Sequence, residues 1–195
     1  MRRKTLDALL TTGGLALSAV LLVAGALLVW GHSFVNGEVH SQLAAQKIFF
    51  PAKGSEAISD PQIAPYLTRY AGQQLVNGAQ ARAYADHYIA VHVAEIAGGQ
   101  TYAQLSGKAL ANPTDTELAG QVQTVFHGET LRGLLLNAYA FWKIGQIALY
   151  AAIAAFAGAG LFLLLSVLGL VHLRRTSPDR DVLMLGARTP APVER

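Results

Sequence analysis

The chain has 195 residues and a formal net charge of +3; 52% of its residues are hydrophobic and only 14% are charged. This balance is typical of membrane proteins. The absence of cysteine excludes disulfides, thiolate metal sites, iron–sulfur clusters and a cysteine nucleophile. The surplus of positive charge lies at the two ends, and the stretch between them is close to neutral. The sequence therefore offers no basic surface for nucleic acid.

The first apolar segment predicts a transmembrane helix over residues 11–31, after a cytoplasmic N-terminus of residues 1–10. The uncharged run from Thr11 to Trp30 corresponds to about 30 Å of helix, which matches the hydrocarbon core of a bilayer. A cleaved signal peptide is the alternative, because Ala24-Gly25-Ala26 fits a small-x-small cleavage rule. The apolar run continues past that point to Trp30, which favours a retained span.

The middle of the chain, residues 32–143, carries helix signals and no strand signals. Val35, Val39 and Leu43 recur every four residues, so the first helix is expected to continue outward until Phe49-Phe50-Pro51. Asp60-Pro61 then predicts the start of a helix that ends at Asn77-Gly78.

Three further signals complete this middle domain. A helix is expected from about Ala79 to Ala97, closed by Gly98-Gly99. Thr101 to Gln104 resembles a capping box, and Thr114 to Glu117 resembles a second one, which opens a segment leading into the next span with Gly128 or Gly133 as bends. The domain is thus expected to be a bundle of four to five helices.

The second apolar segment predicts a transmembrane helix over residues 144–173, followed by a disordered cytoplasmic tail of residues 174–195. Between Ala151 and Gly160, eight of ten residues are alanine or glycine, and Ala151, Ala155 and Ala159, or Ala154 and Gly158, repeat at four-residue spacing. Such a face allows helices to approach closely. It predicts packing against the first span or another copy, although a span that is merely rich in alanine has the same pattern.

Both basic ends indicate the cytoplasm by the positive-inside rule. The predicted fold is therefore all-α: a hairpin of two transmembrane helices, N-in/C-in, with the helical domain of residues 32–143 inserted on the extracytoplasmic side. We therefore expect a multi-pass membrane protein in contact with membrane lipid.

The polar residues of the middle domain give one candidate site and no reaction centre. Four residues, two histidines each with a nearby glutamate, would suit a divalent metal if the fold brought them together: His92, Glu95, His127 and Glu129. Tyr139 and Lys143 have the spacing of a dehydrogenase pair, but no glycine-rich strand–helix unit accompanies them. The sequence therefore predicts no enzyme and no cofactor.

Three segments carry a family resemblance: Ser41–Pro51, Ala83–Tyr102 and Gly128–Asn137. Together they resemble an uncharacterised family of actinobacterial two-span membrane proteins, over about residues 10–175. The resemblance implies a cell-envelope location with the helical domain outside the plasma membrane. It implies no activity, cofactor or catalytic residue.

The preferred functional hypothesis is a non-enzymatic envelope protein whose outward domain binds a protein or lipid partner, or a second copy of the chain. Its basis is a near-neutral domain with several tyrosines, a residue common both in binding surfaces and in small helical cores. One alternative is an extracytoplasmic metal or ligand sensor that uses the histidines and glutamates named above. Another is an anchor of a larger membrane complex, retained like an uncleaved signal.

Overall fold

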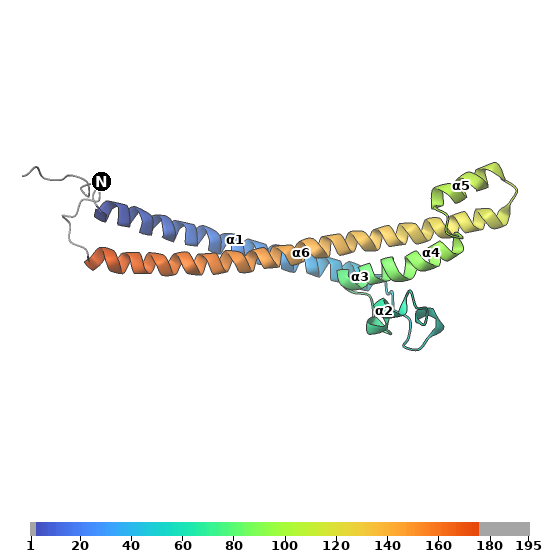
Figure 1. Cartoon of the computed structure of the whole chain (residues 1–195), viewed down its shortest axis with the longest axis horizontal. Helices are drawn as coiled ribbons and strands as arrows, with labels where there is room; N and C mark the ends of the chain where they lie inside the picture. Colours follow the sequence, from blue (N-terminus) through green and yellow to red (C-terminus); the bar gives the residue numbers. More distant parts are fainter. Residues whose placement is uncertain (1–2, 176–195) are drawn as a thin grey trace, which may run out of the picture. The chain divides into compact units, whose positions relative to one another are not determined.

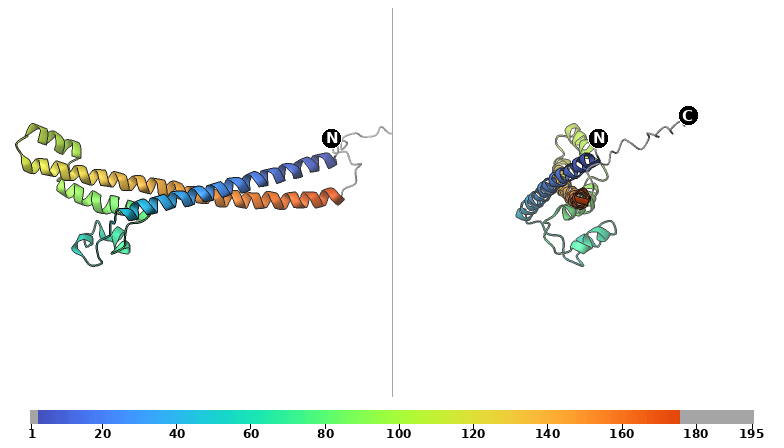
Figure 2. Two further views of the ribbon diagram at one scale, coloured as in Figure 1. Left: turned by 180° about the vertical axis from the view of Figure 1, so that it is seen from behind. Right: turned by 90° about the vertical axis from the view of Figure 1, so that its left-hand side faces the viewer.

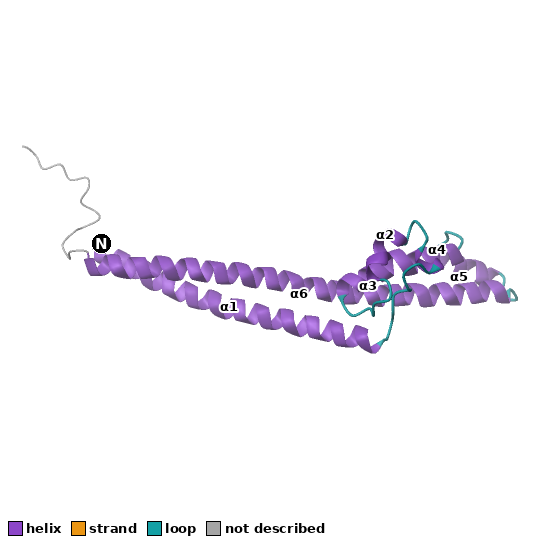
Figure 3. Cartoon of the chain, turned by 90° about the horizontal axis from the view of Figure 1, so that it is seen from below, coloured by secondary structure: helices purple, strands orange, loops and turns teal. Residues whose placement is uncertain are grey.

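The computed structural model describes residues 3–175 and divides the chain into two compact units. One unit comprises Met1–Val29 and Leu149–Arg195, and the other comprises Trp30–Ala148. Two long helices, α1 (Arg3–Ala45) and α6 (Thr116–Arg175), contribute to both (Figure 1). In the described part of the chain every regular element is a helix, which confirms the predicted all-α class (Figure 3). The predicted tail lies outside the described residues from position 176 onward.

In the first unit, α1 and α6 lie side by side along a seam of small and hydroxyl-bearing residues (Figure 2). The fully buried members of this seam are Thr11, Ser18, Ala152, Ala159 and Ser166. Ser18 Oγ donates a hydrogen bond of 2.9 Å to the Ala159 carbonyl oxygen. Small residues let the two backbones approach closely, as is usual for helices that pair in lipid.

The opposite faces of the same two helices are apolar and exposed. Val20 and Leu27 of α1 are each 63% exposed, and Leu164 of α6 is 57% exposed. Both helices are long and apolar enough to cross a membrane, judged by length and composition. The prediction of two long apolar helices is therefore confirmed.

The predicted alanine face is only partly correct. Ala152 and Ala159 are buried in the seam, whereas Ala151 is exposed. Contact positions on a paired helix follow alternating steps of three and four residues, because a constant step of four drifts around the helix.

The second unit packs a mostly helical chain segment against α6. The helices α3 (Gly78–Tyr84) and α4 (Ala90–Ile96) are joined without a break by a π-helical turn, η3 (Ala85–Ile89). These three elements together match the helix expected from about Ala79 to Ala97. The following helix, α5 (Tyr102–Ala111), begins with the predicted capping box of Thr101 and Gln104.

The π-helical turn keeps one face of the segment α3–η3–α4 in the core. Its hydrogen bond runs from the Ala90 N–H to the Ala85 carbonyl oxygen, five residues back. Buried side chains recur at every fourth position along the segment: Ala81, Ala85, Ile89, Val93 and Ala97. In a regular α-helix a step of four residues rotates by about 40°, so five such positions would spread over both sides. The wider turn absorbs one residue and so reduces that drift enough to keep these positions on one side.

Residues 46–77 differ most from expectation. The helix α1 ends at Ala45 rather than near Pro51, because Lys47 adopts a positive φ of 54° and Gln74 Nε2 donates a 2.8 Å hydrogen bond to the Ala44 carbonyl oxygen. Phe49 and Gln74 then form an isolated antiparallel bridge. These contacts commit the chain around Phe49 to an extended conformation.

The predicted helix from Asp60 to Asn77 is wrong in extent. The structure contains only short helical pieces here: η1 (Glu56–Ile58), α2 (Ala64–Leu67) and η2 (Thr68–Tyr70). Asp60 forms a turn instead of a helix cap, since its Oδ1 accepts from the Gln62 N–H at 2.6 Å. Gly72, with a φ of 72°, then turns the chain back toward the Phe49 segment. The apolar spacing reflects core contacts of Ile63 and Leu67.

The helix α6 begins one residue later than the predicted capping box implies, and its cap is Asp115. The Asp115 carboxylate accepts from the Leu118 N–H at 2.9 Å, which replaces Thr114 in that role. Neither Gly128 nor Gly133 interrupts the helix. Gly128 instead lies against the Val93 side chain, where a Cβ would collide with it. The glycine serves close packing rather than bending.

Candidate functional site

The polar residues of the second unit gather beside the π-helical turn. Glycine and alanine on facing helices bring α3–η3–α4 close to α6, as at Gly128 and Val93. Charged residues at the edge of this contact then reach from one helix to the other. π-helical turns occur often at functional sites, so this region is a candidate site.

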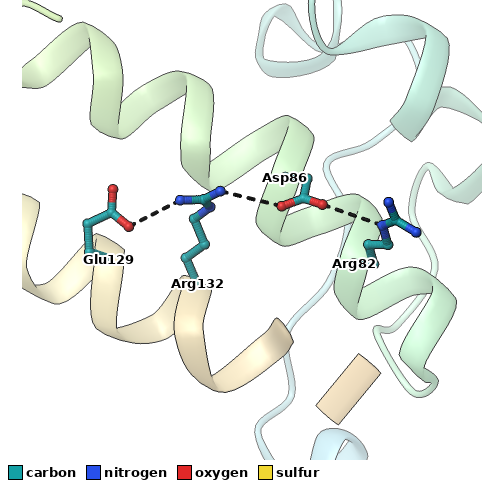
Figure 4. Close-up of polar contacts among 4 residues, drawn as sticks. All are labelled: Arg82, Asp86, Glu129 and Arg132. Atoms are coloured by element: carbon teal, nitrogen blue, oxygen red, sulfur yellow. Dashed lines mark hydrogen bonds and ion pairs between the residues drawn. The ribbon is translucent and has the colours of Figure 1, made fainter. Parts of the chain in front are cut away.

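Four charged side chains form a chain of ion pairs across the two helices, called here the charge network: Arg82, Asp86, Glu129 and Arg132 (Figure 4). Asp86 lies between the two arginines, with Oδ2 at 3.5 Å from Arg82 Nε and Oδ1 at 3.6 Å from Arg132 Nη2. Arg132 Nη1 also lies 3.3 Å from Glu129 Oε2. Two positive and two negative charges balance each other.

Tyr139 extends this network along α6. Arg82 Nη1 donates a 2.9 Å hydrogen bond to Tyr139 Oη, and the guanidinium carbon lies 4.9 Å from the centre of the Tyr139 ring. The hydrogen bond and charge interaction with Tyr139, followed by those with Asp86, raise the pKa of Arg82. Arg82 is thus held as a cation between two partners.

An aromatic column fills the core side of the π-helical turn. The Phe50 ring contacts the rings of Tyr70 and Tyr84, with centroids 5.1 and 5.3 Å away, and Tyr84 contacts Tyr88 at 4.8 Å. Burial, and to a smaller extent the neighbouring Tyr88, raise the pKa of Tyr84 to about 12. Tyr70, Tyr84 and Tyr88 pack against the core, whereas Tyr66 and Tyr102 are exposed.

The structure does not gather the four predicted metal ligands in one place. His92 Nδ1 is 2.9 Å from the Tyr88 carbonyl oxygen, and His92 and Glu95 line one hollow. His127 Nε2 is 3.0 Å from Gln123 Nε2, and Glu129 belongs to the charge network. Within residues 3–175 no group of three or more histidine, aspartate and glutamate side chains is placed to hold a metal ion. Metal binding stays a prediction.

The hollow at His92 contains acidic residues that the sequence did not associate with it. Glu56 and Asp60 line it together with His92 and Glu95. They come from the loop near η1, about 35 residues earlier in the chain, whose path was not predictable from local patterns. Arg82 with Asp86, four residues apart, and Glu129 with Arg132, three apart, were readable as helical ion pairs. The ion pair between Asp86 and Arg132, which joins these two pairs, could not be predicted from the sequence.

A second cavity, called here the outer groove, lies between α1 and the α6 residues of the same unit. Its volume is about 470 Å³. Large apolar side chains form its walls, among them Phe34, Leu134 and Phe141, and polar groups including Glu38 and Asn137 lie among them. The regular spacing of Val35, Val39 and Leu43 predicted that this part of α1 is helical, but it did not predict an open groove.

The geometry of the charge network suits attachment of one helix to another. Each carboxylate has an arginine partner, and the ion pairs join two helices of one unit. The outer groove, in contrast, leaves apolar walls uncovered and is suited to binding. Comparison with protein-family models, with curated proteins and with solved structures finds no match for this chain.

Proposed function

We propose that this is an integral protein of a bacterial plasma membrane that crosses the bilayer twice and presents residues 30–148 outside as a binding module for an envelope partner. The two chain ends lie in the cytoplasm. The module performs no chemistry of its own; it docks a lipid or protein partner at the membrane surface.

The observation that carries the proposal is the side-chain pattern of the first unit. Its helices bury hydroxyl and small residues between them and expose valine and leucine, with Val20, Leu27 and Leu164 all more than half exposed. A helix pair in water has the reverse pattern, since its apolar faces are buried. Lipid as the surrounding solvent explains both halves of the pattern.

Charge and aromatic residues support the orientation. Arg3 and Lys4 precede the first apolar stretch, and Arg174 and Arg175 follow the second. Trp30 marks the other end of the first stretch. Basic residues favour the cytoplasmic side, and tryptophan favours the interface between lipid and water. The assignment to the actinobacterial family and the role as anchor of a larger complex remain predictions beside this proposal.

Single-cysteine labelling tests the topology directly, because the natural chain contains no cysteine and gives no background. Ala111→Cys places a thiol at the exposed end of α5, and Thr5→Cys places one at the exposed start of α1. A membrane-impermeant maleimide should label the first variant in intact cells and the second only after lysis. The reverse labelling pattern, or recovery of the protein without membranes, would contradict the proposal.

Cross-linking in native membranes tests the binding role. The tagged full-length chain is cross-linked, extracted in mild detergent and examined for components that co-purify at fixed stoichiometry. We expect such a component to be lost when the groove-wall substitution Phe141→Ser is made and kept when Leu110→Ser is made, since Leu110 is exposed outside the groove. A clean monomer with no bound component would remove the basis for a binding module.

A further inference from the structure

The outer groove presents uncovered apolar walls near the end of each long apolar stretch. Phe34, Leu134 and Phe141 line it and are 57%, 59% and 60% exposed. Phe34 lies one helical turn beyond Trp30, and their rings stack with centroids 5.8 Å apart. Covering side chains of this size with an apolar ligand is favourable, and a contiguous exposed apolar patch often marks a binding groove.

The side chains that line the groove on α1 change from aromatic to polar along the helix. Phe34 is followed one turn farther from the apolar stretch by Glu38. On α6, which runs the opposite way along the chain, Phe141 is preceded one turn farther by Asn137, and the exposed Leu134 lies beyond it. The order along α1 is that of an amphiphile whose chain points toward the membrane and whose head points away from it.

The charge of the groove restricts the head group. Glu38 is the ionisable residue among its lining side chains, and no lysine, arginine or histidine lines it. Gln42 Nε2 donates a 3.2 Å hydrogen bond to Glu38 Oε2, which leaves further acceptor positions on the carboxylate. A cationic head group that donates N–H hydrogen bonds can fill those acceptor positions. A head group with only negative charge would find no cationic side chain in the groove lining. The amide of Asn137 supplies an N–H donor for a phosphate.

We propose that the outer groove binds a phospholipid with a primary amine in its head group, of the phosphatidylethanolamine type. The ammonium pairs with Glu38, the phosphate accepts from the Asn137 amide, and the acyl chain covers Phe34 and Phe141. This inference rests on the proposed function in one respect, since the lipid reaches the groove from the bilayer. It names the partner that the binding module takes.

The test compares lipids of identical acyl chains on the full-length protein in mild detergent, by native mass spectrometry. The probes are phosphatidylethanolamine, phosphatidylcholine and phosphatidylglycerol. Phosphatidylcholine is the matched control, because its quaternary ammonium has no N–H to donate. We expect phosphatidylethanolamine to bind roughly fivefold more tightly than phosphatidylcholine.

Two substitutions separate the head from the chain. Glu38→Gln keeps the shape and should reduce the preference for the ethanolamine head to about one. Phe141→Ser should weaken the binding of phosphatidylethanolamine and of phosphatidylcholine roughly tenfold each and leave the ratio of their affinities unchanged. Glu117→Gln removes an exposed carboxylate outside the groove and should change neither value. Because Glu38 and Phe141 are exposed, neither variant disturbs the core.

Three outcomes would overturn the inference. The first is equal binding of all lipids with no effect of the variants, and the second is a preference for phosphatidylglycerol. The third is efficient disulfide cross-linking between copies of Phe141→Cys, which would place a second chain on the groove.

Failure of the lipid inference is distinguishable from failure of the topology. If the thiol at position 111 is labelled from outside and the ethanolamine preference is absent, only the lipid inference falls. If the preference is present and position 111 is inside, only the topology falls.

Discussion

Ser18 of α1 and Ala159 of α6 are joined by a hydrogen bond from the serine hydroxyl to the alanine carbonyl oxygen, at 2.9 Å. The contact fixes the register of the two helices in the first unit. We predict that the double variant Ser18→Cys/Ala159→Cys forms a disulfide within one chain, because the contact brings the two backbones near the distance that a disulfide spans. The control pair Val20→Cys/Ala159→Cys should not form a disulfide, since Val20 is exposed on another face of α1. Migration on non-reducing gels distinguishes a bond within one chain from a dimer.

The close contact of Gly128 with Val93 predicts a large effect of one methyl group. Gly128→Ala should destabilise the protein by about 1–3 kcal/mol, because its Cβ would collide with Cγ2 of the buried Val93. Gly133→Ala is the matched control on the same helix, where a Cβ meets nothing within 4 Å. It should be neutral or stabilising by up to about 1 kcal/mol, because alanine favours helix. Thermal unfolding of the two variants measures the difference, and equal midpoints would contradict the packing.

The raised pKa of Tyr84 predicts a loss of stability at alkaline pH. Burial raises this pKa from 10.0 to about 12, so the folded state holds the phenol proton more tightly than the unfolded state. The corresponding stability is fully present below pH 10 and is lost as the pH rises through about 12. Phenolate absorbance during a pH titration should show one tyrosine ionising last, and Tyr84→Phe should remove that phase. Titration of all tyrosines together near pH 10 would contradict it.

The charge network predicts a small, salt-dependent contribution to stability. Arg132→Ala leaves Asp86 and Glu129 without their shared partner, but the side chains of Asp86, Arg132 and Glu129 are 28%, 34% and 43% exposed. We therefore expect a loss of about 1 kcal/mol or less, which shrinks as salt is added. Lys53→Ala, an exposed loop residue, should have no comparable effect. A loss that is large and independent of salt would mean that Arg132 acts through packing.

The sequence predicted those elements whose signals are local. The capping box of Thr101 and Gln104 and the four-residue spacing of Val35, Val39 and Leu43 both correspond to helix in the structure. The prediction failed between residues 46 and 77, where pairing of Phe49 with Gln74 overrides the helical pattern. A contact between segments 25 residues apart leaves no local trace in either one.

The candidate sites depend even more on contacts between distant segments. The pairing of Asp86 with Arg132 and the convergence of Glu56 with Glu95 on one hollow both need the tertiary fold. The repeat of buried residues from Ala81 to Ala97 did contain a signal for the π-helical turn, because a strict period of four is too long for a regular α-helix. The order of Phe34 and Glu38 was equally visible in the sequence, but the groove that they line depends on how α1 and α6 lie beside each other.

The π-helical turn makes the chain length between residues 81 and 97 as important as the residue types. A π turn is equivalent to one extra residue inside an α-helix, so deletion of a single residue from Ala85–Ile89 would restore regular winding and leave Val93 and Ala97 facing the core. Insertion of one residue that winds as regular helix would instead rotate everything after it by about 100° relative to what precedes it. Val93 and Ala97 would then leave the core together, and the contact with Gly128 would be lost. This segment is therefore expected to tolerate the loss of one residue in the turn better than the gain of one.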